Sequence, residues 1–315
     1  MTTGTSLWRS ARPVVAVGTL AVVVWYLGIG PFLDGIRAVD RAALVVGAGI
    51  GMLTTVCCAW RWTTVAHGLG LRLSFPAAVA ACYRSVFLNL TLPGGVVGDV
   101  HRGVSHGRNV RDVGLALRAV AWERTAGQVV EAVLTVAVLV ALPSPVRLSI
   151  PLVLVVLVAL VIGVALVGRT RPGDGRSRWA RVRRAIARDV RDALLARKAW
   201  PVVVLASFLI VIGHAITFVI AARTAGATAP LSELFPLATL AMLAMVLPSV
   251  AGWGPREGAT AWAFAAAGLG ADLGVATAVV YGVMVLVASL PGALVLVAAW
   301  VPRTAIAGTG RAADV

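Results

Sequence analysis

Charged side chains are scarce in this sequence. They make up 13% of its 315 residues, whereas 59% of the residues are hydrophobic and the mean hydropathy is +0.92. A soluble domain carries roughly 25% charged residues, because its surface faces water. The composition therefore excludes an ordinary soluble protein and predicts a polytopic membrane protein.

Sequence motifs for nucleotide-driven or zinc-dependent chemistry are also missing. There is neither a Gly-x-x-x-x-Gly-Lys-Ser/Thr phosphate loop nor a His-Glu-x-x-His zinc motif. The three cysteines, Cys57, Cys58 and Cys82, form neither a metal-site spacing nor a disulfide framework. We therefore expect no metal and no cofactor, and we expect the cysteines to pack as small apolar side chains.

Acidic residues are few relative to basic ones. The chain has 13 Asp and Glu against 28 Lys and Arg, which gives a formal net charge of +15. The anionic head groups of membrane lipids are natural partners for such a charge. Nucleic acid is not expected as a partner, because the basic residues lie in short loops between apolar runs rather than on one soluble face.

Long apolar runs dominate the rest of the chain. Six of them reach the ~20 residues that a membrane-spanning helix needs: 13–33, 42–60, 119–142, 148–168, 200–222 and 275–301. Two further apolar segments, 74–97 and 234–270, are interrupted by Pro93-Gly94-Gly95 and by Pro248 through Pro255. We interpret each as a re-entrant hairpin, although two full crossings in the second segment would fit equally well.

The predicted fold is an all-α polytopic membrane protein with about eight transmembrane segments. These segments form a single domain over residues 1–301, and residues 302–315 form a short tail that we expect to be disordered. The basic segment 169–199 carries ten Arg and one Lys, so the positive-inside rule places it in the cytoplasm. Its second half, from Trp179 to Trp200, has the pattern of an amphipathic helix that rests on an anionic leaflet.

This orientation places both chain ends on the cytoplasmic side of the inner or plasma membrane. Residues 61–73 and 99–118, which carry an excess of arginine, are then cytoplasmic loops. The segment 74–97 starts and ends inside, whereas 234–270 starts and ends outside.

The two interrupted segments resemble each other. Each ends an apolar run at Leu-Pro, passes through small residues and then meets charges of both signs. The residues expected to form the turns are Pro93, Gly94, Gly95 and Gly98 in the first segment, and Pro248, Gly252 and Gly254 in the second. Broken helices at corresponding positions of two oppositely oriented halves are typical of inverted-repeat transporters, whose site lies at the repeat interface.

Polar residues also recur within the 119–142 span. Arg124, Gln128, Glu131 and Thr135 are spaced by four, three and four residues, which places them on one helix face. A polar face in a membrane must contact protein or water. It could line a site, or it could form structural ion pairs such as Arg124 with Glu131 or Glu123 with Arg102.

Several of these residues resemble a known family. The run Arg84…Asn89…Leu92-Pro93…Gly98-Asp99…Arg102, the Glu123-Arg124 pair and the run Pro248…Gly252-Trp253-Gly254…Glu257 are similar to the flippase-like integral membrane family. This family comprises the transmembrane region of lysylphosphatidylglycerol synthases and their stand-alone relatives. The resemblance implies a bundle that moves lipids, such as aminoacylated phosphatidylglycerol or a polyprenyl-linked sugar carrier, between leaflets.

The sequence departs from this family in two respects. Gln128 follows Glu123-Arg124 where an acidic residue is expected nearby, so a charge relay there is in doubt. No soluble aminoacyl-transferase domain follows the bundle, so we do not expect synthase activity.

The leading hypothesis is therefore a lipid flippase, not an enzyme. Arg84, Arg102 and Arg124 are expected to bind a phosphate through their forked donors. Asp99, Glu123 and Glu257 would hold those arginines or bind a cationic head group. The full predicted set of substrate-binding residues is Arg84, Asn89, Asp99, Arg102, Glu123, Arg124, Gln128, Arg256 and Glu257.

Two alternatives remain open. The first is an intramembrane transferase that acts on a lipid phosphate, with Asp99 or Glu123 as the base. The second is an accessory subunit of a lipid or cell-envelope glycan pathway, whose partner would be a separate lipid-modifying enzyme or glycosyltransferase.

Overall fold

The computed structural model describes residues 29–142, 178–247 and 253–300, together with the single residues Trp25, Pro151, Val155 and Ser249. Within these ranges the chain forms ten α-helices, one short π-helix and no β-sheet. The helices are α2 (Gly30–Ala38), α3 (Arg41–Gly68), α4 (Phe75–Thr91), α5 (Val97–Val110), α6 (Val113–Ala141), α8 (Arg178–Asp189), the π-helix η2 (Val190–Leu194), α9 (Trp200–Thr224), α10 (Leu231–Ala244), α11 (Pro255–Ala266) and α12 (Ala271–Trp300).

Four of these helices are long and apolar enough to cross a membrane. They are α3, α6, α9 and α12, whose apolar lengths run from 25 to 29 residues. At 1.5 Å per residue even the shortest is about 37 Å long, more than the hydrocarbon thickness of a bilayer. They confirm the predicted spans 42–60, 119–142, 200–222 and 275–301. The tail 302–315 lies outside the described residues. Of the predicted span 148–168 only Pro151 and Val155 are described. The predicted span 13–33 is described only at Trp25 and from residue 29 onward.

Two predicted loops are helical instead. Residues 61–68 continue α3, and residues 99–110 belong to α5, so the prediction of loops over 61–73 and 99–118 was wrong in these parts. In both places a helix carries buried arginines, whereas the positive-inside rule treats arginines as marks of cytoplasmic loops. Arg61 is 5% exposed and Arg102 is 1% exposed.

The first hairpin consists of α4 and α5. α4 ends at Thr91, directly before Leu92-Pro93, and the chain reverses through Gly94 and Gly95, whose φ angles of 108° and 65° suit glycine. The two arms then pack closely, because a Cβ atom on Gly98 would lie 2.0 Å from the carbonyl oxygen of Ser85. The predicted helix break at Pro93-Gly94-Gly95 is therefore confirmed. The second arm of the hairpin is α5, which begins at Val97, where the predicted segment ends.

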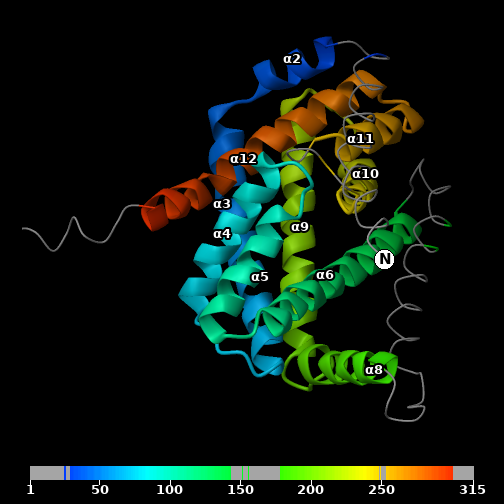
Figure 1. The fold of residues 1–315 in the computed structure, drawn as a ribbon. Coiled ribbons are helices and arrows are strands. Elements are labelled where there is room, and N and C mark those ends of the chain that lie inside the picture. Colours follow the sequence, from blue (N-terminus) through cyan, green and yellow to red (C-terminus); the bar gives the residue numbers. More distant parts are fainter. Residues whose placement is uncertain are drawn as a thin grey trace, which may run out of the picture.

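The second hairpin consists of α10 and α11. α11 begins at Pro255 after Gly254, whose φ is 114°, and the Glu257 carboxylate accepts a 2.6 Å hydrogen bond from the Gly254 amide. Such a carboxylate stabilises a helix N-terminus by satisfying a free amide. The predicted turn residues Pro248 and Gly252 lie outside the described residues. Figure 1 shows the two hairpins entering the bundle from opposite ends, α4–α5 from below and α10–α11 from above.

Small residues allow the long helices to approach one another. Cβ atoms added to Gly47 and Gly51 of α3 would lie 2.7 and 2.5 Å from side-chain atoms of Met284 and Ala288 on α12. On the other side, Phe218 of α9 packs between the rings of Phe264 and Tyr281. These contacts fix α3, α9, α11 and α12 around one interior, as expected for helix packing in membranes.

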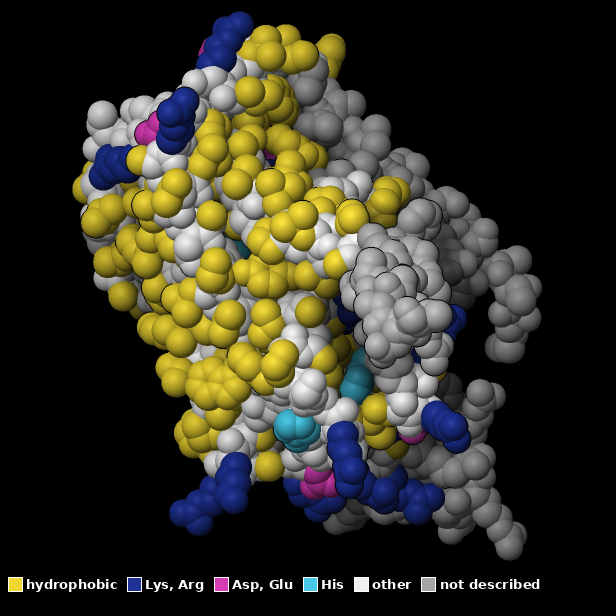
Figure 2. All heavy atoms as spheres, turned by 90° about the vertical axis from the view of Figure 1, so that its left-hand side faces the viewer, with side chains coloured by type: hydrophobic (Ala, Val, Ile, Leu, Met, Phe, Trp, Pro, Cys, Tyr) yellow, Lys and Arg dark blue, Asp and Glu magenta, His cyan; other side chains and the backbone are white. Residues whose placement is uncertain are grey.

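The outer surface has the distribution of side chains expected in a bilayer. Figure 2 shows hydrophobic side chains over the middle of the viewed face, with Lys and Arg side chains toward its two ends. The predicted amphipathic helix from Trp179 to Trp200 is shorter than expected, because α8 ends at Asp189 and η2 and a turn precede α9. The buried Asp189 accepts a 3.1 Å hydrogen bond from Trp122 and forms a 3.2 Å ion pair with Arg118. Both partners lie on α6, so these contacts attach the end of α8 to α6.

Candidate functional site

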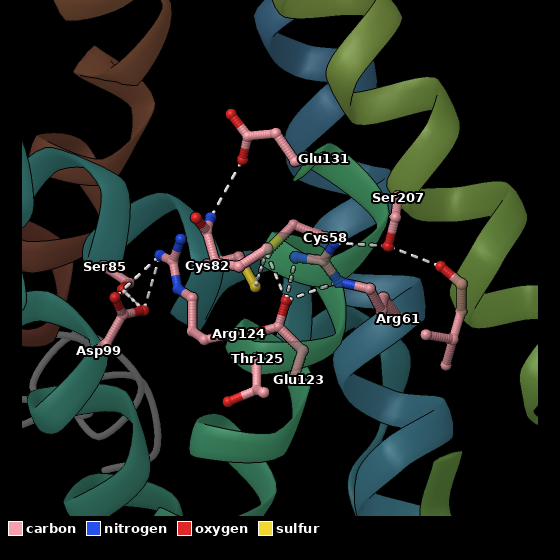
Figure 3. A network of polar contacts seen from close by, with 12 residues as sticks. Cys58, Arg61, Cys82, Ser85, Asp99, Glu123, Arg124, Thr125, Glu131 and Ser207 are labelled. Atoms are coloured by element: carbon pink, nitrogen blue, oxygen red, sulfur yellow. Dashed lines mark hydrogen bonds and ion pairs between the residues drawn. The ribbon is translucent and has the colours of Figure 1, made fainter. Parts of the chain in front are cut away.

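Glu123 of α6 is the centre of a buried ion network. Its carboxylate is 0% exposed and accepts hydrogen bonds from Arg61 of α3, at 2.8 Å from Nε, and from Arg102 of α5, at 2.5 Å from Nη2. A second guanidinium nitrogen of Arg61 also contacts Glu123. Figure 3 shows the side chains of Arg61 and Glu123 meeting from separate helices. Since an unpaired buried charge costs several kcal/mol, each partner requires the others.

Asp99 of α5 is the second carboxylate of this network. It accepts hydrogen bonds from Ser85 at 2.9 Å, from Asn89 at 3.1 Å and from Arg124 at 2.9 Å, and Arg102 lies 3.0 Å away. Arg102 therefore bridges Asp99 and Glu123. Of the two ion pairs that the sequence suggested, Glu123 with Arg102 forms. Arg124 does not pair with Glu131 but with Asp99.

Arg61 was missed by the sequence analysis. Besides Glu123, it donates a 2.8 Å hydrogen bond to Ser207 of α9, and Gly127 leaves the space that its guanidinium fills. A Cβ atom on Gly127 would lie 2.6 Å from Arg61 Nη1. The segment from Trp62 to Ala66 carries no charged residue and continues the helix beyond Arg61, and this continuation was the signal that could have placed Arg61 inside a span.

The two hairpin bends touch each other next to this network. The Gly94 amide donates a 2.9 Å hydrogen bond to the Ser249 carbonyl, and a Cβ atom on Gly95 would lie 2.8 Å from Ser249 Oγ. The bends therefore meet within the bundle, although 155 residues separate Gly94 from Ser249 in the sequence.

A central cavity of about 250 Å³ lies between the hairpin bends and the long helices. Predicted residues that line it are Asn89, Gly95, Arg124, Gln128 and Arg256. Polar lining residues that were not predicted as ligands are Arg61, Glu131, Ser207, His214, Ser249 and Tyr281. A smaller cavity of about 110 Å³ shares Arg61, Arg124 and His214 with it.

Several cavity-lining side chains have unused hydrogen-bonding atoms. Arg124 Nε, Gln128 Oε1 and Arg256 Nη1 are buried and have no hydrogen-bond partner among the described residues. Buried polar atoms are normally satisfied, because leaving them unpaired costs free energy. These atoms are therefore available to a polar ligand or to water in the cavity.

The other predicted ligands do not line the cavity. Glu257 is 0% exposed and forms an ion pair with Arg256 as well as capping α11. Arg102 lies over the Trp62 ring, 4.8 Å from its centroid, behind the cavity wall. Glu123 pairs with Arg61, and Asp99 pairs with Arg124, but neither carboxylate lines the cavity. Arg84 is not among the lining residues either. Asp99, Arg102, Glu123 and Glu257 therefore contact other buried charges rather than the cavity, and the ligand roles expected for them stay predictions.

The fold and the site together define a polytopic membrane protein whose charged cavity lies where two opposed hairpins meet. The model of the family described as Lysylphosphatidylglycerol synthase TM region matches residues 12–292, which is most of the chain. The chain therefore belongs to this family. A comparison with curated proteins finds no match.

Proposed function

We propose that this protein moves a lipid with an anionic phosphate head group between the two leaflets of the membrane. The cargo class includes anionic or aminoacylated phospholipids and polyprenyl-phosphate-linked lipids. The observation that carries the proposal is the central cavity, where Arg61, Arg124 and Arg256 converge beside two hairpin bends in hydrogen-bond contact. A head group needs such a polar site to cross hydrocarbon, whereas its acyl chains can remain in lipid.

Arginine suits a phosphate ligand. Its planar guanidinium offers forked donors, and phosphate oxygens accept two of them at once. Arg124 donates a hydrogen bond to Asp99 through Nη2, whereas its Nε has no partner among the described residues. Arg256 forms an ion pair with Glu257, and its Nη1 has no partner among the described residues. In this proposal both arginines are held rigidly by carboxylates and present their remaining donors to the lipid.

We interpret the two hairpins as corresponding parts of an inverted repeat. Their arms enter from opposite ends of the bundle (Figure 1). Their bends are joined by the Gly94–Ser249 hydrogen bond, and Gly95 and Ser249 line the cavity. This arrangement supports movement in which one hairpin opens toward one leaflet while the other closes. The basic segment around α8 supports an orientation with that end in the cytoplasm.

Reconstitution into liposomes tests the proposal. The liposomes would contain either a fluorescent phosphatidylglycerol or a fluorescent polyprenyl-phosphate analogue, and a membrane-impermeant quencher would report the outer-leaflet fraction over time. We expect quenching to exceed one half of the label for at least one lipid in protein-containing vesicles only. Equal quenching in protein-free vesicles for both lipids would contradict the proposal.

An intramembrane transferase is the second candidate. Gly103-Val-Ser105-His106-Gly107 has the Gly-x-Ser-x-Gly spacing of a serine hydrolase, but it lies within α5 and not at a strand-to-helix turn. Asp99 and Glu123, the proposed bases, are engaged by arginines instead of facing the cavity. Mass spectrometry of lipids incubated with the purified protein in detergent tests this candidate, since a transferase changes the mass of its substrate.

An accessory role in a lipid or cell-envelope glycan pathway is the third candidate. It would require a separate lipid-modifying enzyme or glycosyltransferase as partner. If the purified protein alone moves lipid in liposomes, no such partner is needed for transport.

A further inference from the structure

The interior of the bundle has balanced charges. The described residues that line the central cavity, or that are joined to its lining by a continuous chain of ion pairs, include four arginines and four carboxylates. The arginines are Arg61, Arg102, Arg124 and Arg256, and the carboxylates are Asp99, Glu123, Glu131 and Glu257. The empty cavity is therefore neutral when all four carboxylates are ionised.

Glu131 differs from the other three carboxylates. Asp99, Glu123 and Glu257 each form an ion pair with at least one arginine, whereas Glu131 forms none with any described residue. Its one hydrogen-bond donor there is Gln128, at 3.1 Å. Figure 3 shows Glu131 apart from the ion network. It lies eight residues, about two helical turns, beyond Glu123 on α6.

The charged and polar side chains that line the cavity together with Glu131 come from several helices. They are Arg61 of α3, Arg124 and Gln128 of α6, His214 of α9, Arg256 of α11 and Tyr281 of α12. His214 is already engaged, because its Nδ1 lies 2.9 Å from the Tyr281 hydroxyl. Among the described lining residues, Glu131 is the one carboxylate that contacts the cavity directly.

We propose that Glu131 takes up a proton when an anionic head group enters the central cavity. This inference rests on the proposed function. A head group with one negative charge would leave the loaded cavity with one unbalanced negative charge in a medium of low dielectric constant, which is costly. A proton from water that reaches the carboxylate through the cavity converts Glu131 to its neutral form and restores neutrality.

The neighbourhood of Glu131 suits the neutral carboxyl. A protonated carboxyl gains one O–H donor, and the amide oxygen of Gln128 is a buried acceptor with no partner among the described residues. Protonation of His214 would also balance the charge, but it would place another cation beside Arg61 and Arg124. Neutralising Glu131 instead removes the negative charge of the one carboxylate among the described lining residues. When the lipid leaves, Glu131 would release the proton to water.

Calorimetry of lipid binding tests this inference. Short-chain phosphatidylglycerol would be titrated into the detergent-purified protein in two buffers of different ionisation enthalpy, so that the difference in heat reports proton uptake. We expect about one proton per bound lipid in the wild type. The Glu131→Gln variant should bind the lipid without uptake, and the matched control Glu233→Gln should behave as the wild type.

The pH dependence gives a second readout. Above the titration range of Glu131 in the empty cavity, affinity should fall about tenfold per pH unit in the wild type and stay flat in Glu131→Gln. Uptake that survives in Glu131→Gln, or that disappears in His214→Asn, would overturn the assignment. Failure to bind any anionic lipid at any pH would instead contradict the proposed function itself, and with it this inference.

Infrared difference spectroscopy of the wild type keeps the test independent of the variants. Addition of an ether-linked phosphatidylglycerol, which has no ester carbonyl of its own, should produce the C=O stretching band of a newly protonated carboxyl group. Absence of this band when calorimetry shows bound lipid would also overturn the proposal.

Discussion

The Gly94 amide donates a 2.9 Å hydrogen bond to the Ser249 carbonyl, so the bends of two hairpins that enter from opposite ends of the bundle are in direct contact. Arg124 and Arg256 line the cavity beside this contact, each held by a carboxylate. A head group bound there would lie beside the two bends. Movement of either bend would then open the cavity toward one end of the molecule.

Locking the bends together should stop lipid movement. A Cβ atom on Gly95 would lie 2.8 Å from Ser249 Oγ, so cysteines at these two positions are close enough to cross-link. We expect Gly95→Cys with Ser249→Cys, in a background without the three native cysteines, to form a disulfide. Reconstituted transport should be abolished under oxidising conditions and restored by a reductant. Each single cysteine variant is the control, and transport by the fully cross-linked protein would contradict a moving bend.

Substitution of Gly98 should destabilise the first hairpin. A Cβ atom at this position would lie 2.0 Å from the Ser85 carbonyl oxygen, and neither backbone can shift without separating α4 from α5. We expect Gly98→Ala to cost about 2 kcal/mol and to lower the thermal unfolding midpoint in detergent. Gly49→Ala is the matched control, because no atom lies within 4 Å of its added Cβ. Equal unfolding midpoints for the two variants would show that α4 and α5 are not closely packed here.

Loss of the Glu123 charge should be more damaging than loss of an exposed one. Glu123→Gln leaves Arg61 and Arg102 buried without their shared counter-ion, at a cost of roughly 3–5 kcal/mol. Thermal unfolding monitored by size-exclusion chromatography measures this effect. Asp34→Asn is the control, since the Asp34 side chain is 71% exposed. A midpoint unchanged in Glu123→Gln would mean that the ion network contributes little to the bundle.

The sequence alone predicted the four described spans and the positions of both helix breaks. Apolar length and the Pro-Gly pattern are local signals, and they hold whatever the chain packs against. The face that carries Arg124, Gln128 and Glu131 was also predictable, because helix periodicity alone defines it.

The partners of these residues could not be predicted. Glu123 binds an arginine 62 positions earlier on α3 and another 21 positions earlier on α5, and no local pattern encodes such pairings. Arg61 and α5 were misread for a related reason. In a membrane protein an arginine indicates a loop only when it lacks a buried carboxylate partner, and that partner becomes visible only when the helices are packed.

Lipid movement by Arg124→Ala, compared with the wild type, tests the central claim most directly. Arg124 lines the cavity, whereas Arg37 is the matched control because its side chain is 76% exposed and lies far outside the ion network. In reconstituted liposomes we predict that Arg124→Ala moves the fluorescent anionic lipid at least about tenfold more slowly, corresponding to the loss of one charge-assisted contact. Arg37→Ala should retain the wild-type rate. Equal rates for Arg124→Ala and the wild type, with both proteins correctly folded, would contradict a transport pathway through the cavity.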